Sequence, residues 1–144
     1  LDQFEFNLIR NTLWGILPTI EGFTAADLCR DDAPAYLAVA REAVAFFQKN
    51  KDDFLTGRPA EILNVSCPAV HIDWTRLDGC TYTKTCPGVQ AVRWELPGGI
   101  NAIFAYNFLS APVSVPLNGR QTTLAPHRLI RIDYSEETGQ RDPV

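Results

Sequence analysis

The sequence predicts an α+β protein in which N-terminal helices and one apolar strand precede an antiparallel, β-sandwich-like domain. Two observations lead to this expectation. Before Gly57 the apolar residues recur at helical spacing, and after it short alternating runs are separated by turn residues. Gly57 and Pro59 themselves stop a helix. We therefore expect a helix–strand–helix segment over 1–57, a β-domain over 58–135 and a flexible polar tail over 136–144.

Two helices are predicted in the first part. The first covers residues 3–13, where Phe4, Leu8 and Ile9 fall at helical spacing. The second covers residues 33–54, with Pro34 in its first turn, where a missing N–H costs nothing. Its predicted apolar stripe consists of Leu37, Ala40, Val44 and Phe47.

Residues 14–20 lie between these helices and read Trp-Gly-Ile-Leu-Pro-Thr-Ile. A short apolar run of this kind is typical of a parallel strand that is buried on both faces. Pro18 would then lie near the end of the strand, where a missing donor is tolerated.

Strands are predicted throughout the second part. The runs that indicate them are 62–66, 71–76, 81–85, 89–96, 100–108, 113–117 and 129–134. The glycines at 98 and 99 supply the positive φ of a tight turn, so 89–108 is predicted to be a hairpin. Asn118-Gly119 is a second hairpin-type turn, expected to connect 113–117 with 129–134.

Length and charge exclude several classes of protein. The chain has 144 residues, enough for one domain, or one domain and a fragment of another. Its formal charge is −4 and its Lys and Arg residues are scattered, which argues against a nucleic-acid surface. No apolar run approaches the roughly 20 residues of a membrane span. Because the chain starts at Leu1 without a methionine, we expect further protein sequence upstream.

The four cysteines, Cys29, Cys67, Cys80 and Cys86, allow three interpretations. They could be free thiols that pack as small hydrophobic groups. Cys80 and Cys86 could close a local disulfide in an oxidising compartment, and the Asn64-Val-Ser66 sequon is compatible with a secreted or periplasmic protein. A zinc site is the third interpretation, but the spacing fits no zinc motif. We therefore expect no metal and no cofactor.

Trp14 and Glu21 are the candidate substrate-binding residues. If 14–20 is a barrel strand, Glu21 follows its carboxyl end, the rim at which (β/α)8 enzymes place their chemistry. Trp14 could stack on a sugar from the same rim. The alternatives are a solvated carboxylate in a loop and a tryptophan in the core. A glycosidase needs two carboxyl groups across the scissile bond, so no catalytic residue is assigned.

The C-terminal part carries a resemblance to glycoside hydrolases. Phe104-Ala-Tyr-Asn-Phe108, residues 113–117 and Leu124-Ala-Pro-His-Arg-Leu-Ile130 resemble the last strands of the antiparallel domain that follows the catalytic barrel in many of these enzymes. Residues 11–19 are similar to the penultimate helix and eighth strand of such a barrel, and residues 33–54 to its final helix.

This resemblance implies the C-terminal portion of a carbohydrate-active glycoside hydrolase. The β-domain would pack on and support the barrel, and the chain alone would be inactive. Its partners would be the rest of the barrel, in the upstream sequence or in another chain, and a carbohydrate. The alternative is a free-standing carbohydrate- or protein-binding β-module, which predicts Trp74, Tyr82 and Trp94 aligned on one sheet face.

Overall fold

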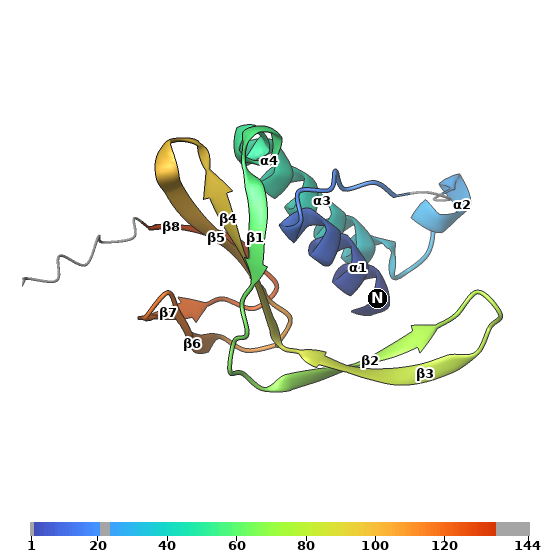
Figure 1. Cartoon of the computed structure of the whole chain (residues 1–144). Helices are drawn as coiled ribbons and strands as arrows, with labels where there is room; N and C mark the ends of the chain where they lie inside the picture. Colours follow the sequence, from blue (N-terminus) through green and yellow to red (C-terminus); the bar gives the residue numbers. More distant parts are fainter. Residues whose placement is uncertain (1, 21–23, 135–144) are drawn as a thin grey trace, which may run out of the picture.

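The computed structural model describes residues 2–20 and 24–134 and has an α+β architecture (Figure 1). Its helices are α1 (Asp2–Leu13), α2 (Ala25–Leu28), α3 (Ala33–Lys49) and α4 (Lys51–Thr56), and a 3-10 turn spans Pro97–Gly99. Its strands are β1 (Arg58–Ile62), β2 (Ala69–Thr75), β3 (Thr81–Pro87), β4 (Val89–Leu96), β5 (Ile100–Asn107), β6 (Val113–Leu117), β7 (Arg120–Leu124) and β8 (Leu129–Tyr134). The tail predicted over 136–144 lies outside the described residues.

The long predicted helix is present but is interrupted at Asn50. The side chain of this buried residue donates to the carbonyl of Phe46 at 2.8 Å, and α4 begins directly after it. The buried residues of α3 are Ala33, Ala40, Ala43 and Phe46. Ala40 of the predicted stripe is therefore confirmed, whereas Ala43 and Phe46 are buried in place of Val44 and Phe47, a shift of one position or about 100° around the helix. Val44 is consequently 44% exposed.

The expected parallel strand over 14–20 is not formed. Every ladder among the described strands is antiparallel, and 14–20 is a turn followed by irregular chain. Ile16 and Leu17 are more than half exposed. A parallel strand needs neighbouring strands to satisfy its backbone groups, and the described part of the chain offers this segment none.

The main sheet has the strand order β1-β4-β5-β8, and β2-β3 and β6-β7 form two further hairpins. The predicted hairpin over 89–108 is confirmed as β4 and β5, which pair along their whole length. Two details of the prediction are wrong. The first strand covers Arg58–Ile62 instead of 62–66, and the Asn118-Gly119 turn connects β6 to β7, a strand the sequence pattern did not reveal. β8 instead pairs with β5.

Both faces of the main sheet are covered. On one face, Trp94, Phe104 and Tyr106 share a core with residues of α1 and α3. On the other face, Ala91, Ile103 and Ala105 pack with residues of β6 and β7, which gives the sandwich-like layering of the β-region. The helical part and the β-region thus share one hydrophobic core across the expected boundary at Gly57.

The β2-β3 hairpin projects from this body as an arm (residues 69–87), which lies alongside α1 (Figure 1). Gly88 joins the arm to β4. Its N–H donates to the carbonyl of Pro68 at 2.9 Å, and its own carbonyl accepts from the N–H of Phe108 at 2.7 Å. A Cβ atom at Gly88 would lie 2.4 Å from the Pro68 oxygen, so only glycine fits at this junction.

Candidate functional site

A buried polar cluster connects α1, β5 and the turn before β8. Glu5 from α1 is 5% exposed and Tyr106 from β5 is 1% exposed. The Tyr106 hydroxyl donates to Glu5 Oε1 at 2.5 Å, and Nδ1 of His127 lies 2.7 Å from the same oxygen. These three residues are called the Glu5 cluster below. Glu5 is 101 positions from Tyr106 and 122 from His127 in the sequence, so only the fold brings it to them.

The protonation of Tyr106 determines the direction of its hydrogen bond. Burial, and then the hydrogen bond to Glu5, raise the pKa of Tyr106 far above its usual value. The hydroxyl therefore keeps its proton and acts as the donor to Glu5. A buried carboxylate is costly unless it is hydrogen-bonded, and Tyr106 together with His127 supplies those bonds.

His127 is held in an unusual backbone conformation. Its φ is 52°, in the left-handed region that non-glycine residues seldom adopt, and its N–H donates to the carbonyl of Asn107 at 2.9 Å. The imidazole directs Nδ1 to Glu5, which leaves Nε2 free for another partner. This arrangement orients an imidazole at the surface, since the His127 side chain is 49% exposed.

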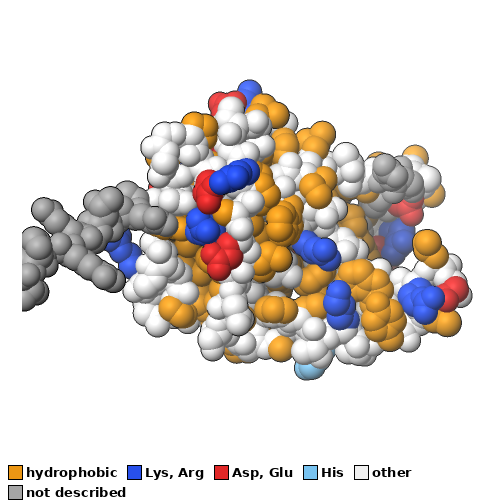
Figure 2. All heavy atoms as spheres, viewed as in Figure 1, with side chains coloured by type: hydrophobic (Ala, Val, Ile, Leu, Met, Phe, Trp, Pro, Cys, Tyr) orange, Lys and Arg blue, Asp and Glu red, His pale blue; other side chains and the backbone are white. Residues whose placement is uncertain are grey.

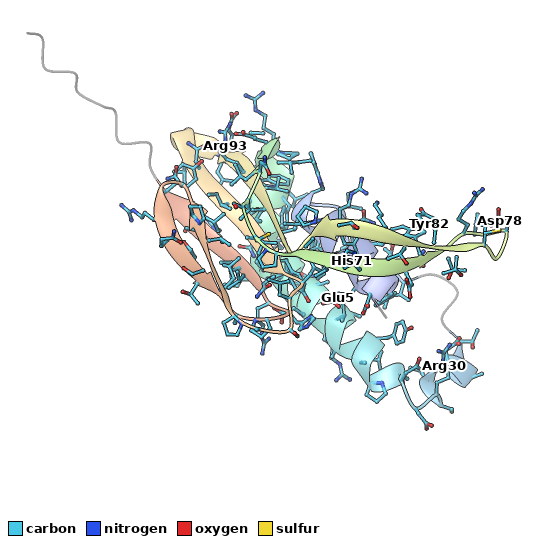
Figure 3. The ribbon with its side chains drawn as sticks, turned by 90° about the horizontal axis from the view of Figure 1, so that it is seen from below. Glu5, Arg30, His71, Asp78, Tyr82 and Arg93 are labelled. Carbon is cyan, nitrogen blue, oxygen red and sulfur yellow. The ribbon has the colours of Figure 1, made fainter. Side chains whose placement is uncertain are left out.

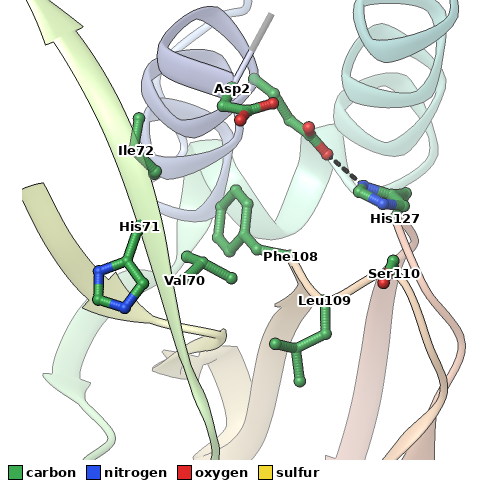
Figure 4. Close-up of a pocket in the computed structure, with 9 residues that line it drawn as sticks. Asp2, Val70, His71, Ile72, Phe108, Leu109, Ser110 and His127 are labelled. Carbon is green, nitrogen blue, oxygen red and sulfur yellow. Dashed lines mark hydrogen bonds and ion pairs between the residues drawn. The ribbon is translucent and has the colours of Figure 1, made fainter. Parts of the chain in front are cut away.

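The Glu5 cluster borders a cavity of about 400 Å³ (Figure 4). Apolar side chains from β2 and from the segment after β5 line most of it, namely Val70, Ile72, Phe108 and Leu109. Asp2, Ser110 and His127 lie at its polar side, and His71 is drawn beyond strand β2, away from the Glu5–His127 contact. Glu5 Oε1 is already occupied by two partners, so the cluster is suited to fastening α1 to the sheet.

Replacing Tyr106 with Phe should test this fastening role. The change removes one donor from a buried carboxylate and keeps the aromatic ring, so we expect a loss of about 2 kcal/mol in the free energy of unfolding. Denaturant unfolding measures the loss, and Tyr82→Phe, at an exposed tyrosine of the arm, is the matched control and should have almost no effect. Equal stability of both variants would show that the bond to Glu5 contributes nothing.

The two predicted substrate-binding residues are not brought together in the described part of the chain. Trp14 is half-buried and packs against the core formed by the helices and the sheet. Glu21 lies outside the described residues. A role of either residue in binding a sugar therefore stays a prediction.

His71 and Asp73 do share one face of β2, as the alternation predicts. Each bonds to a threonine of the neighbouring strand, His71 to Thr85 at 3.1 Å and Asp73 to Thr83 at 2.9 Å. These exposed bonds connect β2 to β3, so both side chains contribute to the structure of the arm. They give no indication of a catalytic pair.

The local disulfide considered for Cys80 and Cys86 does not form. All four cysteines are free, and strand β3 separates these two. Six residues of extended strand span about 20 Å, far beyond the reach of a disulfide. Among residues 2–20 and 24–134, no three His, Cys, Asp or Glu side chains gather as a metal site would require. None of the described helices is long and apolar enough to span a membrane.

Sequence reasoning missed the Glu5 cluster. Glu5 looks like an ordinary acidic residue in the first turn of a helix, and His127 looks like a turn residue. The only signal is that Glu5 lies between two phenylalanines, Phe4 and Phe6. Nothing local indicates that its partners are Tyr106 and His127.

Comparison with models of protein families, with curated proteins and with solved structures finds no match to this chain. Its function is therefore argued from the packing and from the residues that the fold brings together.

Proposed function

We propose that this chain is the C-terminal portion of a carbohydrate-active glycoside hydrolase. In this proposal the β-region packs on and supports the last helices of a (β/α)8 catalytic barrel. The chain by itself supplies no catalytic centre. The rest of the barrel would come from upstream sequence or from another chain.

The packing of the sheet on α1 and α3 is the observation that carries this proposal. The end of α1 falls in the segment 11–19, which resembles the penultimate helix and eighth strand of the barrel, and α3 lies in the segment 33–54, which resembles its final helix. The largest fully buried side chains of the sheet, Trp94, Phe104 and Tyr106, all point to them. The indole N–H of Trp94 also donates to the carbonyl of Leu13 at the end of α1, at 2.9 Å. A sheet face devoted to these helices is what a supporting β-domain requires.

The helical part also exposes apolar side chains that a barrel would cover. Ile16, Leu17, Leu28 and Val44 are each between 44% and 55% exposed. Two of them lie in the 14–20 segment, which has strand-like composition but no neighbouring strand. A partner that supplies parallel strands would both bury these side chains and satisfy the backbone of the segment.

The residues that carry the family resemblance hold the end of the β-region together. Asn107 is fully buried, and its amide donates to the carbonyls of Ala111 and Leu124 while its oxygen accepts from the N–H of Leu109. It thereby joins the end of β5 to the end of β7. His127, in the same motif, contacts Glu5 of α1. The motif residues therefore link β-strands to each other and to a helix.

Two measurements test the proposal together. The gene upstream of Leu1 should encode the remaining strands and helices of a barrel, and the enzyme so encoded should hydrolyse aryl glycosides. The purified chain of residues 1–144 should give no turnover with the same substrates, because in this proposal the pair of carboxyl groups that hydrolysis needs comes from the other strands of the barrel.

Two results would contradict the proposal, and each would lead to a different conclusion. A signal peptide directly upstream of Leu1 would favour the free-standing β-module. Glycoside turnover by the purified chain, abolished by Glu21→Gln, would show that the chain contains its own catalytic centre.

A further inference from the structure

A groove runs over the exposed side of α1, between the arm and the start of α3. It consists of two adjoining cavities of about 620 and 540 Å³ that share Gln3, Asn7 and Thr75. We call it the arm groove. α2 and the tip of the arm project on the same side of the molecule, where Figure 3 shows Arg30 on one projection and Asp78 on the other. The shared residues make this an elongated site, longer than one compact pocket.

The lining of the arm groove combines aromatic rings with amide groups. Tyr36 and Phe4 line the first cavity, and Trp74 lines the second. Asn7 and Gln3 contribute amides at the point where the two cavities meet. Figure 2 shows a group of apolar side chains on part of the arm, with Lys and Arg side chains beside it. Aromatic side chains with a few polar groups are the usual lining of a ligand site.

Several of these groups are held in place before any ligand binds. The ammonium of Lys84 lies 4.8 Å from the centre of the Trp74 ring, and Phe6 meets that ring edge-on. Phe4 packs against Tyr36 at 5.1 Å between ring centres. Gln3 exchanges two hydrogen bonds with the backbone of Thr75 and so fixes the arm to α1. Such preorganisation lowers the cost of binding.

Other groups in the groove are available to a ligand. The amide of Asn7 and the hydroxyl of Tyr36 make no hydrogen bond to any residue in the described ranges, and both residues are half-buried. An amide offers two donors and an acceptor, and a phenol offers one of each. Free polar groups beside aromatic rings suit a ligand that carries many hydroxyl groups on apolar rings.

Charge narrows the class of ligand further. The lining residues include three acidic ones, Asp2, Asp73 and Asp78, and one basic one, Arg76, which is paired with Asp78 at 3.2 Å. Lys84 beside Trp74 adds a second positive charge, and Arg30 over the Tyr36 ring is paired with Asp32. Because the Arg30 pair is neutral, the acidic residues exceed the basic ones by one, which favours a neutral polymer over an acidic one.

We propose that the arm groove binds a neutral polysaccharide. The C–H faces of the sugar rings pack on Trp74 and Tyr36, and the sugar hydroxyls bond to Asn7. The choice of a carbohydrate rests on the proposed function, whereas the position of the site rests on the groove. None of the residues of the Glu5 cluster lines either cavity, and neither does Trp14.

Affinity electrophoresis of the whole chain tests this site. Native gels would contain hydroxyethylcellulose, xyloglucan, galactomannan or soluble starch as neutral probes, and carboxymethylcellulose or alginate as acidic ones. We expect at least one neutral polymer to retard the chain and both acidic polymers to leave it unretarded. The double variant Asn7→Ala/Tyr36→Ala should bind about tenfold more weakly, since it loses a ring and an amide.

Asn11→Ala is the matched control, because Asn11 lies one turn along the exposed side of α1 and does not line either cavity. It should bind as the parent chain does. If the double variant does not fold, the single variant Asn7→Ala answers the same question, with a smaller expected loss of affinity. The proposal is overturned if the double variant and Asn7→Ala are both retarded as strongly as the parent chain. It is also overturned if only the acidic polymers retard the parent chain.

The failure of this proposal and that of the proposed function can be told apart. If no neutral polymer retards the chain, the groove is not a binding site for neutral polysaccharides, and the proposal of a barrel upstream is not affected. Retardation that depends on Asn7 and Tyr36, in a chain whose gene encodes no barrel, confirms the groove and refutes the proposed function. Capture of a peptide in place of any polysaccharide would contradict the ligand class.

Discussion

A fragment of residues 58–134 is expected to remain unfolded in isolation. The sequence pattern alone suggests the opposite, since the hairpins of this region satisfy much of their own backbone. The structure places three large aromatic side chains, Trp94, Phe104 and Tyr106, against helices that the fragment lacks. Each such side chain buries about 150–250 Å², which corresponds to about 4–6 kcal/mol at about 25 cal/mol per Å².

The loss of these contacts is comparable with the whole stability of a domain, which is about 5–15 kcal/mol. Thermal unfolding followed by circular dichroism compares the fragment with the whole chain. The whole chain should give one cooperative transition and the fragment none. A cooperative transition in the fragment would instead support the division into two domains at Gly57.

Trp94→Ala should be the most damaging single substitution. The ring is 2% exposed and contacts Phe54 and Phe104 at 5.2 and 5.8 Å between ring centres. Truncation of a buried aromatic residue leaves a cavity and costs about 3–5 kcal/mol. The carbonyl of Leu13 also loses the indole donor, which lowers the free energy of unfolding further.

Denaturant unfolding should show that the Trp94→Ala variant keeps little or none of the free energy of unfolding of the parent chain. Trp94→Phe should be less damaging, because it keeps much of the ring volume and loses only the indole donor. Tyr82→Ala, at a residue that is 48% exposed, should be nearly neutral. A Trp94→Ala variant as stable as the parent chain would mean that the sheet and the helices do not share a core.

The elements with a strong local signal were predictable from the sequence. The 89–108 hairpin follows from its alternation and from the glycines of its turn, which have φ of 79° and 75°. The helix over 2–13 follows from its periodicity. The segment 14–20 was not predictable, because a short apolar run has the same composition in a buried strand as in an irregular segment.

Elements without apolar alternation were also missed. β7 reads Arg-Gln-Thr-Thr-Leu, in which only Leu124 is buried, so its pairing with β6 leaves little trace in the sequence. The one-position error in the α3 stripe has a similar cause. Ala43 faces the core, and the larger Val44 beside it looks more like a core residue than an alanine does.

The candidate sites were less predictable than the fold. The alternative of a free-standing β-module predicts Trp94 as an exposed aromatic of a binding face, whereas Trp94 is 2% exposed. Glu5, Tyr106 and His127 meet only through the packing of α1 on the sheet. Asn7 and Tyr36 stand near each other in the arm groove for the same reason, and no local spacing connects them.

The junction at Gly88 has an evolutionary consequence. Because this glycine fixes where the arm leaves the body, the arm can change length at its tip without disturbing the main sheet. Residues added in equal number to the tip ends of β2 and β3 keep the two strands in register, and they leave the direction of Trp74 unchanged because Trp74 lies nearer the body than the added residues. Relatives with longer or shorter arms should therefore differ by the same number of residues in both strands. Such changes would lengthen or shorten the arm groove while the rest of the fold stays the same.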